Sequence, residues 1–186
     1  MRPGRLWRPD QQLGQSGVQA FLDEIEAAVP ALRRYARALT GDQDMADDLV
    51  QDCIERALRK SALFRPQGPL RAWLFTMLLN IHRNGARARR RRGIGVPLDE
   101  LPVEPAIPAP QPSRIDLADM ARAIDHLPDE QREALLLVVL EDMPYAEAAA
   151  ILGVPLGTLM SRLGRARAAL RTLTGTTPEP RLRTVK

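Results

Sequence analysis

Several residue types are scarce in this 186-residue chain, and each shortage excludes a class of protein. The single cysteine, Cys53, rules out an internal disulfide and any zinc site built from cysteines, as expected in a reducing compartment. The two histidines, His82 and His126, lack metal-ligand spacing, and the chain contains no glycine-rich phosphate loop. We therefore expect no metal, no cofactor and no enzyme activity.

Long hydrophobic runs are also missing. No uninterrupted apolar stretch approaches the roughly 20 residues of a membrane span. No apolar segment follows the arginines near the N-terminus, so no signal peptide is evident. Aromatic residues make up only 4% of the chain, which is too few for a row of base-stacking side chains. These features predict a soluble cytoplasmic protein without membrane insertion.

Lysine is almost absent, because 25 of the 27 basic residues are arginine. The formal net charge is only +4, but the arginines cluster, and segment 83–92 carries six of them at the end of a predicted helix. Such a run can be a disordered tail, a targeting signal or a phosphate-binding surface. Guanidinium groups bind phosphates and guanine edges well, so we favour a nucleic-acid surface. A GC-rich genome would produce the same bias, which makes it only supporting evidence.

Apolar residues recur at helical spacing along most of the chain, which predicts an all-α fold. Helices are expected to begin near Ser16, afresh at Pro30 and again at Pro69. The helix over 42–60 has acidic residues at its start and basic residues at its end, as the helix dipole favours. Its predicted buried stripe is Met45, Leu49, Cys53 (or Ile54) and Ala57.

A proline-rich segment divides the chain. Residues 93–114 contain six prolines, which cannot propagate a helix, so an extended linker is predicted between two small helical domains. The run Ala134–Leu140 is apolar nearly all round and predicts a central buried helix in the second domain. The predicted boundaries are 1–16 for a flexible arm, 17–92 for the first domain, 93–113 for the linker, 114–173 for the second domain and 174–186 for a flexible tail.

The stretch from Tyr145 to Arg171 predicts two helices around a tight turn. Gly153 is free to take the left-handed backbone that ends a helix, and Pro155 follows it. The apolar stripe of the second helix is Leu159, Leu163, Ala166 and Leu170. The opposite face carries arginine, serine and threonine, with no acidic residue between Val154 and Thr174, whereas a merely solvated helix usually mixes charges. This pattern predicts a helix-turn-helix whose second helix enters a major groove of DNA.

Three stretches, in this order, resemble bacterial RNA polymerase sigma factors of the extracytoplasmic function (ECF) group in the sigma-70 superfamily. DMADDLVQDCIERAL at 44–58 is similar to the family's core-polymerase-binding helix, and LRAWLFTMLLNIHRN at 70–84 is similar to its −10 promoter-binding helix. Residues 127–170 resemble the family's −35-binding domain nearly end to end. The resemblance covers about residues 18–173. It implies a promoter-specificity subunit that binds core RNA polymerase and promoter DNA, and it suggests control by an anti-sigma factor.

The resemblance also implies roles for particular residues. The polymerase-binding set, on adjacent turns of one helix, is Asp48, Gln51, Asp52 and Ile54. The set for the −10 element, where one flipped base and the phosphates would be held, is Phe64, Asn80, Arg83, Arg87 and Arg90. The set for the −35 element is Thr158, Ser161, Arg162 and Arg165. An ordinary solvated acidic face and a satisfied amide are the alternatives for the helix at 42–60 and for Asn80.

Two other functions remain open. Met160 and Gly164 replace larger or basic residues that are common in the family, so a sigma-like decoy that binds an anti-sigma protein without engaging DNA is one alternative. A stand-alone helix-turn-helix regulator is the other, although the acidic helix at 42–60 would then have no purpose.

Overall fold

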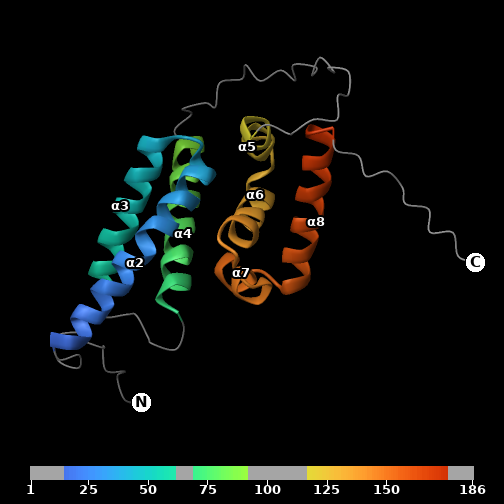
Figure 1. Ribbon diagram of the computed structural model, residues 1–186. Helices are drawn as coiled ribbons and strands as arrows, with labels where there is room; N and C mark the ends of the chain where they lie inside the picture. Colours follow the sequence, from blue (N-terminus) through green and yellow to red (C-terminus); the bar gives the residue numbers. More distant parts are fainter. Residues whose placement is uncertain (1–14, 62–68, 92–116, 176–186) are drawn as a thin grey trace, which may run out of the picture.

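The computed structural model describes residues 15–61, 69–91 and 117–175, and these ranges contain helices and no strand. The all-α prediction is confirmed (Figure 1). The N-terminal half consists of α2 (Gln15–Thr40), α3 (Gln43–Arg59) and α4 (Leu70–Arg91). The C-terminal half consists of α5 (Leu117–Asp125), α6 (Asp129–Leu135), the π-helical turn η2 (Leu136–Leu140), α7 (Tyr145–Leu152) and α8 (Leu156–Leu173). None of the described helices is both long and apolar enough to cross a membrane.

Helix α2 continues through Pro30, where the sequence predicted a fresh helix, and that prediction was wrong. Proline removes one backbone donor, and the carbonyl left free belongs to Glu26, which is exposed to solvent. The apolar stripe of α2 runs unbroken across the proline, with Ile25 and Ala28 before it and Leu32 after it all buried. Burial of this continuous stripe against α3 and α4 holds the two segments in one helix.

Helix α3 begins as the sequence predicted. The Asp42 carboxylate caps it by accepting a 2.8 Å hydrogen bond from the backbone N–H of Met45. Met45 itself is 43% exposed, so its predicted place in the buried stripe was wrong. The predicted Leu49 and Ala57 are buried, and the stripe begins at Ala46, whose small side chain lets α3 lie close to its neighbours. Cys53 is fully buried in this core, as predicted.

The predicted central helix of the C-terminal half changes from α-helical to π-helical hydrogen bonding after Leu135. Helix α6 widens into the π-turn η2, where the Glu141 N–H donates to the carbonyl of Leu136 at 3.2 Å. The start of the predicted buried run is indeed buried, but Val139 is 64% exposed, so the expectation of burial nearly all round fails at its end. The chain then reverses at Asp142, which has a positive φ of 51°, before α7 begins.

The predicted helix-turn-helix is formed by α7 and α8. Gly153 adopts the left-handed conformation with φ 69°, and the Val154 N–H donates to the Ala149 carbonyl at 3.0 Å, which closes the end of α7. Leu159 and Leu163 then anchor α8, being 0% and 1% exposed. The opposite face of α8 is left on the surface.

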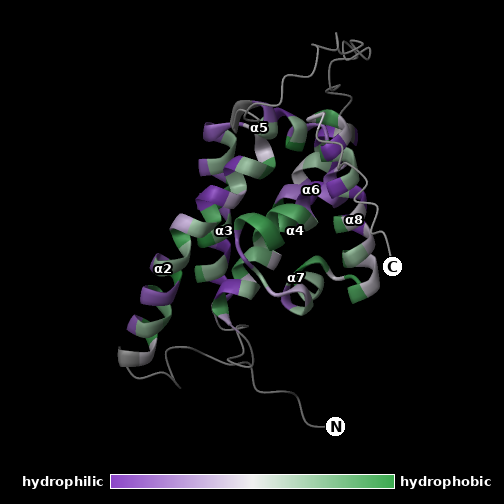
Figure 2. Ribbon diagram, turned by 45° about the vertical axis from the view of Figure 1, so that its right-hand side comes forward, coloured by the Kyte–Doolittle hydropathy of each residue, from purple (hydrophilic) through white to green (hydrophobic). Residues whose placement is uncertain are grey.

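The two halves pack against each other. Helix α4 lies against α7, and α2 lies against η2, so one continuous apolar core runs through both halves. Figure 2 shows the hydrophobic stretches gathered between the two sets of helices and hydrophilic residues on the outer faces. At the centre the rings of Tyr35 and Phe75 meet edge to face, with centroids 5.2 Å apart. The linker and both termini predicted from the sequence lie outside the described residues, and the predicted domain boundaries stay predictions.

Candidate polymerase-binding and DNA-binding surfaces

The contact between the halves is built around buried carboxylates. Among the described residues, Glu133 and Glu141 are the charged residues that are buried, each with 3% of the whole residue exposed. Both belong to the C-terminal half, and both bind arginines from the N-terminal half. Because an unpaired buried carboxylate is strongly unfavourable, these two residues require the arginines of the other half whenever the interface is closed.

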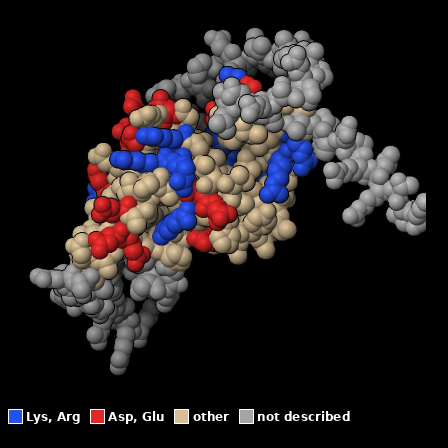
Figure 3. Space-filling view, in the orientation of Figure 1, with Lys and Arg blue, Asp and Glu red and all other residues tan. Residues whose placement is uncertain are grey.

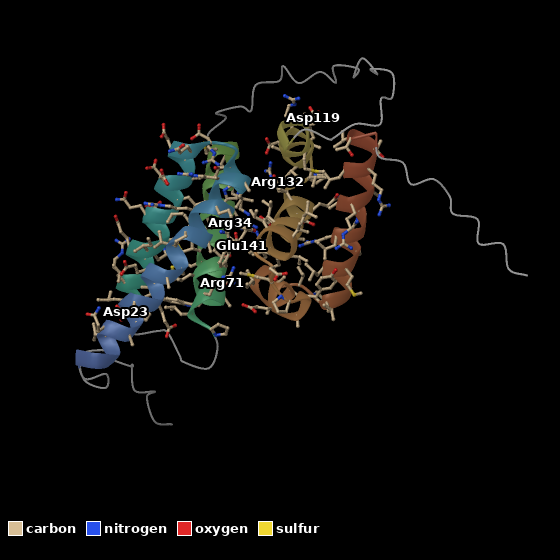
Figure 4. The ribbon with its side chains drawn as sticks, in the orientation of Figure 1. Asp23, Arg34, Arg71, Asp119, Arg132 and Glu141 are labelled. Carbon is tan, nitrogen blue, oxygen red and sulfur yellow. The ribbon has the colours of Figure 1, made fainter. Side chains whose placement is uncertain are left out.

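Glu141 receives two arginines. Arg34 of α2 donates from Nε at 2.9 Å and from Nη2 at 2.7 Å, one nitrogen to each carboxylate oxygen. Arg71 of α4 donates to the same carboxylate at 2.9 Å and to the Glu141 carbonyl at 3.1 Å. Figure 4 shows the three side chains meeting between α2, α4 and the C-terminal half. Glu141 directly follows the π-turn, and its carboxylate is directed at Arg34 and Arg71 of the N-terminal half.

Glu133 binds one arginine in the same bidentate geometry. Arg83 of α4 donates from Nε at 3.0 Å and from Nη2 at 2.6 Å, and this hydrogen bonding raises the pKa of the guanidinium. The Tyr35 hydroxyl donates to the Glu133 carbonyl at 3.3 Å. Burial, reinforced by the nearby Glu133 charge, raises the pKa of Tyr35 well above its ordinary value.

A cleft of about 370 Å³ lies between α4 and the C-terminal half. Three basic side chains from the predicted DNA-binding sets line it, Arg83 and Arg87 from α4 and Arg162 from α8. Its acidic lining residues, all from α6, are Asp129, Glu130 and Glu133. His82 lies there too, and burial lowers the pKa of its imidazole. Arginines from both the predicted −10 set and the predicted −35 set therefore line one shared cleft in this arrangement.

The residues predicted for the −10 element differ in accessibility. Asn80 is exposed on α4, and Arg87 is exposed at the edge of the cleft. Arg83 is held by Glu133, and its side chain is only 29% exposed. Phe64 and the side chain of Arg90 lie outside the described parts of the structure, although the backbone of Arg90 continues α4. Asn80 and Arg87 are thus exposed to solvent, whereas Arg83 is partly buried in its pair with Glu133.

The residues predicted for the −35 element share the outer part of α8. Ser161 and Arg165 are exposed, and the Arg165 guanidinium donates to the Ser161 hydroxyl at 3.0 Å. Thr158 is half-buried. Arg162 points the other way, because its Nη2 donates to Glu130 at 2.7 Å and its side chain is only 12% exposed. Two of the predicted DNA-binding arginines are thus bound to carboxylates of α6.

The residues predicted for polymerase binding lie on α3. Asp48, Gln51 and Asp52 are exposed, and the Gln51 side chain donates to Glu55 at 3.2 Å. Ile54 is half-buried beside them. Helix α3 contacts α2 and α4 on its inner side, which leaves this acidic face open. In Figure 3 acidic side chains lie around a group of basic ones over α2 and α3, and a second basic group lies over α8.

Sequence reasoning missed the residues that join the halves, namely Arg34, Arg71, Glu133 and Glu141. A signal was present, because the two glutamates flank the most apolar run of the C-terminal half. A charged residue at the border of a helix predicted to be buried calls for a buried partner. Their partners, however, are 107 and 50 residues away for the pairs with Arg34 and Arg83, and no local pattern identifies them.

Family models match both halves of the chain. The model described as the Sigma2 domain of PhyR matches residues 25–79, and the model described as Sigma-70, region 4 matches residues 117–170. The order of the two matches follows the order of the two helical halves. The second match contains α7 and all but the last three residues of α8.

Individual relatives match most of the chain. The ECF RNA polymerase sigma factor EcfG of Rhodopseudomonas palustris (strain TIE-1) is 43% identical over 154 residues, covering 81% of this chain and 83% of that protein. The sigma factor RpoE, solved with the anti-sigma factor NepR from Bartonella quintana, is similar in structure with a TM-score of 0.72 at 36% identity, covering 86% of this chain and 99% of that one.

The anti-anti-sigma factor PhyR, solved with NepR from the same organism, shares only the fold. Its TM-score is 0.56 at 17% identity, and the match covers 81% of this chain and 49% of that one. The identity and coverage of EcfG decide the assignment, together with the two family models. The chain belongs to the family of ECF RNA polymerase sigma factors.

Proposed function

We propose that this protein binds core RNA polymerase and directs it to promoters by contacting the −10 element with α4 and the −35 element with α8. The observation that carries the proposal is the position of the three surfaces on one fold. The acidic face of α3 is open on the outside, while the arginines of α4 and α8 lie on other faces. One molecule can therefore bind a large protein and DNA at the same time, working in the cytoplasm where the polymerase is.

The acidic face of α3 suits a basic helical partner. Asp48 and Asp52 are four residues apart, so their carboxylates project from the same side of the helix. Carboxylates in this arrangement accept charge-assisted hydrogen bonds from arginines. Leu58, which is 44% exposed on the last turns of α3, adds apolar area at the edge of the same surface.

The two DNA surfaces have to separate before they can work together. Elements centred at −10 and −35 lie 25 base pairs apart, which is on the order of 80 Å along the duplex. Arg83 and Arg162 line one cleft, so the closed arrangement cannot reach both elements. The 25 residues between Arg91 and Leu117 in the sequence can span at most roughly 80–90 Å when extended. That length is sufficient for the two halves to open and bind both elements.

Transcription in vitro with purified core polymerase tests this function directly. We expect the chain to produce initiation at specific promoters, and we expect Asp48→Arg to abolish it by reversing charge on the polymerase-binding face. Asp23→Arg is the matched control, because Asp23 is an exposed acid on α2 outside that face. Circular dichroism should show the same helix content in both variants. If Asp48→Arg supported as much transcription initiation as Asp23→Arg, α3 would not be part of the polymerase interface.

We also propose that an anti-sigma protein controls this chain. The similar RpoE from Bartonella quintana was solved with the anti-sigma factor NepR. A partner that binds both halves while they are closed would hold the DNA-binding arginines in the cleft. Such a partner, purified and added to the transcription assay, should suppress initiation, and a variant with separated halves should need more of it. If suppression were the same for open and closed variants, the partner would not act through closure.

A decoy for an anti-sigma protein is the second candidate function. It is favoured by the match of the N-terminal half to the Sigma2 domain of PhyR, a protein that is itself described as an anti-anti-sigma factor. Exposed Met160 and Gly164 on α8 also reduce the possible base contacts. A decoy would bind the anti-sigma protein but give no initiation with core polymerase, so the same transcription assay separates the two functions.

A further inference from the structure

We propose that the acidic edge of α6, formed by Glu130 and Glu133, is an internal substitute for DNA phosphates that occupies one arginine of each DNA-binding surface. The inference rests on the proposed DNA-binding roles of α4 and α8. Glu130 and Glu133 are three residues apart and so lie on the same side of α6, facing the cleft. Glu130 holds Arg162 of α8, and Glu133 holds Arg83 of α4.

The geometry of the Arg83 pair resembles that of an arginine bound to phosphate. Two parallel N–H···O bonds of 3.0 and 2.6 Å join the planar guanidinium to both carboxylate oxygens. An arginine uses the same two donors for a bidentate phosphate contact through this edge, so Glu133 and a DNA phosphate compete for that edge of the Arg83 guanidinium. Arg162 makes a single 2.7 Å contact with Glu130. The other acid of the cleft, Asp129, pairs with Arg132 of its own helix at 2.9 Å.

The two glutamates have different consequences because they lie in different surroundings. Glu130 and Arg162 both belong to the C-terminal half, and the Glu130 side chain is 69% exposed, so this pair conceals an arginine without joining the halves. Glu133 has a 3% exposed side chain, and its arginine comes from the other half. Release of Arg83 to DNA would leave that carboxylate buried without a cation unless α4 also moved away from α6.

DNA binding and closure are therefore competing states. Closure pairs Arg83 with Glu133, so DNA that binds Arg83 favours separation of the halves by the same factor by which closure weakens DNA binding. Pairing of the two arginines with Glu130 and Glu133 would lower the affinity of the free protein for random DNA. Binding to a larger partner that separates the halves would make Arg83 available, whereas Arg162 becomes available only when a phosphate displaces Glu130.

Fluorescence energy transfer in the full chain measures the closure. Dyes can be placed on the exposed ends of α3 and α8 through Lys60→Cys and Thr172→Cys in a Cys53→Ala background. We expect Glu133→Gln to lower the transfer efficiency, because the interface loses its paired charge. Glu130→Gln should leave the efficiency unchanged, because Glu130 and Arg162 lie in the same half. If Glu133→Gln also left it unchanged while circular dichroism showed a folded protein, Glu133 would not hold the halves together.

Binding to a random-sequence duplex of about 40 base pairs tests the concealment. The double variant Glu130→Gln with Glu133→Gln should bind about tenfold more tightly at low salt than the control Asp119→Asn with Asp142→Asn. The control changes net charge equally, Asp119 pairs with Arg122 of its own helix, and asparagine tolerates the positive φ of Asp142. Glu130→Gln alone should give an intermediate gain.

The salt dependence gives an independent readout. Two more phosphate contacts without competing carboxylates should steepen the slope of log K against log salt concentration by roughly 2. Equal gains and equal slopes for the double variant and its control would mean that only net charge matters, and would overturn the inference. A chain that shows the expected changes but fails to support initiation with core polymerase would refute the sigma function and leave the internal pairing intact.

Discussion

Loss of the two arginines around Glu141 should separate the halves without unfolding either of them. The perturbation is Arg34→Ala combined with Arg71→Ala. The Glu141 side chain is 0% exposed and is paired with both arginines at 2.7 and 2.9 Å, so the double variant leaves a buried carboxylate without a cation. Breaking a buried pair in this way costs about 3–5 kcal/mol, which lowers the ratio of closed to open molecules by roughly 10²–10⁴-fold.

The reverse substitution should have a smaller effect. Glu141→Gln removes the buried charge and leaves Arg34 and Arg71, whose side chains are already 51% and 42% exposed and can be hydrated. The cost should be about 1 kcal/mol, the net value of a typical hydrogen bond. The double arginine variant should therefore weaken closure by about 2–4 kcal/mol more than Glu141→Gln does. This difference arises because only one partner of the pair, the carboxylate, is buried.

Two measurements distinguish opening from unfolding. Energy transfer between dyes on α3 and α8 should fall far more in the double arginine variant than in Glu141→Gln, and helix content by circular dichroism should stay the same. Opening relieves the penalty because it is the N-terminal half that covers Glu141. Equal effects of the two variants, or loss of helix together with loss of transfer, would refute this reasoning.

Three further expectations concern the fold itself. Asp42→Ala should lower the free energy of unfolding by about 1 kcal/mol and the melting temperature by about 2–4 °C, since α3 loses its cap. Leu159→Ala should lower the free energy of unfolding, measured by chemical denaturation, by about 2–5 kcal/mol, because the Leu159 side chain is fully buried. Met160→Ala should lower it by less than about 0.5 kcal/mol, because Met160 is exposed. Similar losses for the two variants would contradict the packing of α8. Burial raises the pKa of the Cys53 thiol from 9.0 to about 12. The folded protein should therefore resist Ellman's reagent, and its free energy of unfolding should fall as the pH rises from 9 toward 12. Rapid reaction of the thiol in the folded protein would contradict this expectation.

The sequence by itself determined the local structure. The acidic residues at the start of 42–60 predicted the start of α3, and Gly153 with Pro155 predicted the turn between α7 and α8, because helix ends and turns depend on residues close in the chain. The periodicity of α8 also predicted which face is buried and which carries Ser161 and Arg165. Even so, the prediction placed Met45 in the core of α3, where the structure buries Ala46 instead, since periodicity alone does not fix the edge of a buried stripe.

Only the tertiary structure decided which arginines are accessible. Arg83 and Arg165 look equally available for DNA in the sequence, yet Arg83 is held by Glu133 of the other half and Arg165 is exposed on α8. The helix through Pro30 and the closure around Glu141 were decided in the same way. The physical reason is that burial of a helix stripe or a carboxylate depends on partners far away in the chain, and the energy of an unpaired buried charge is large enough to determine how the two halves meet.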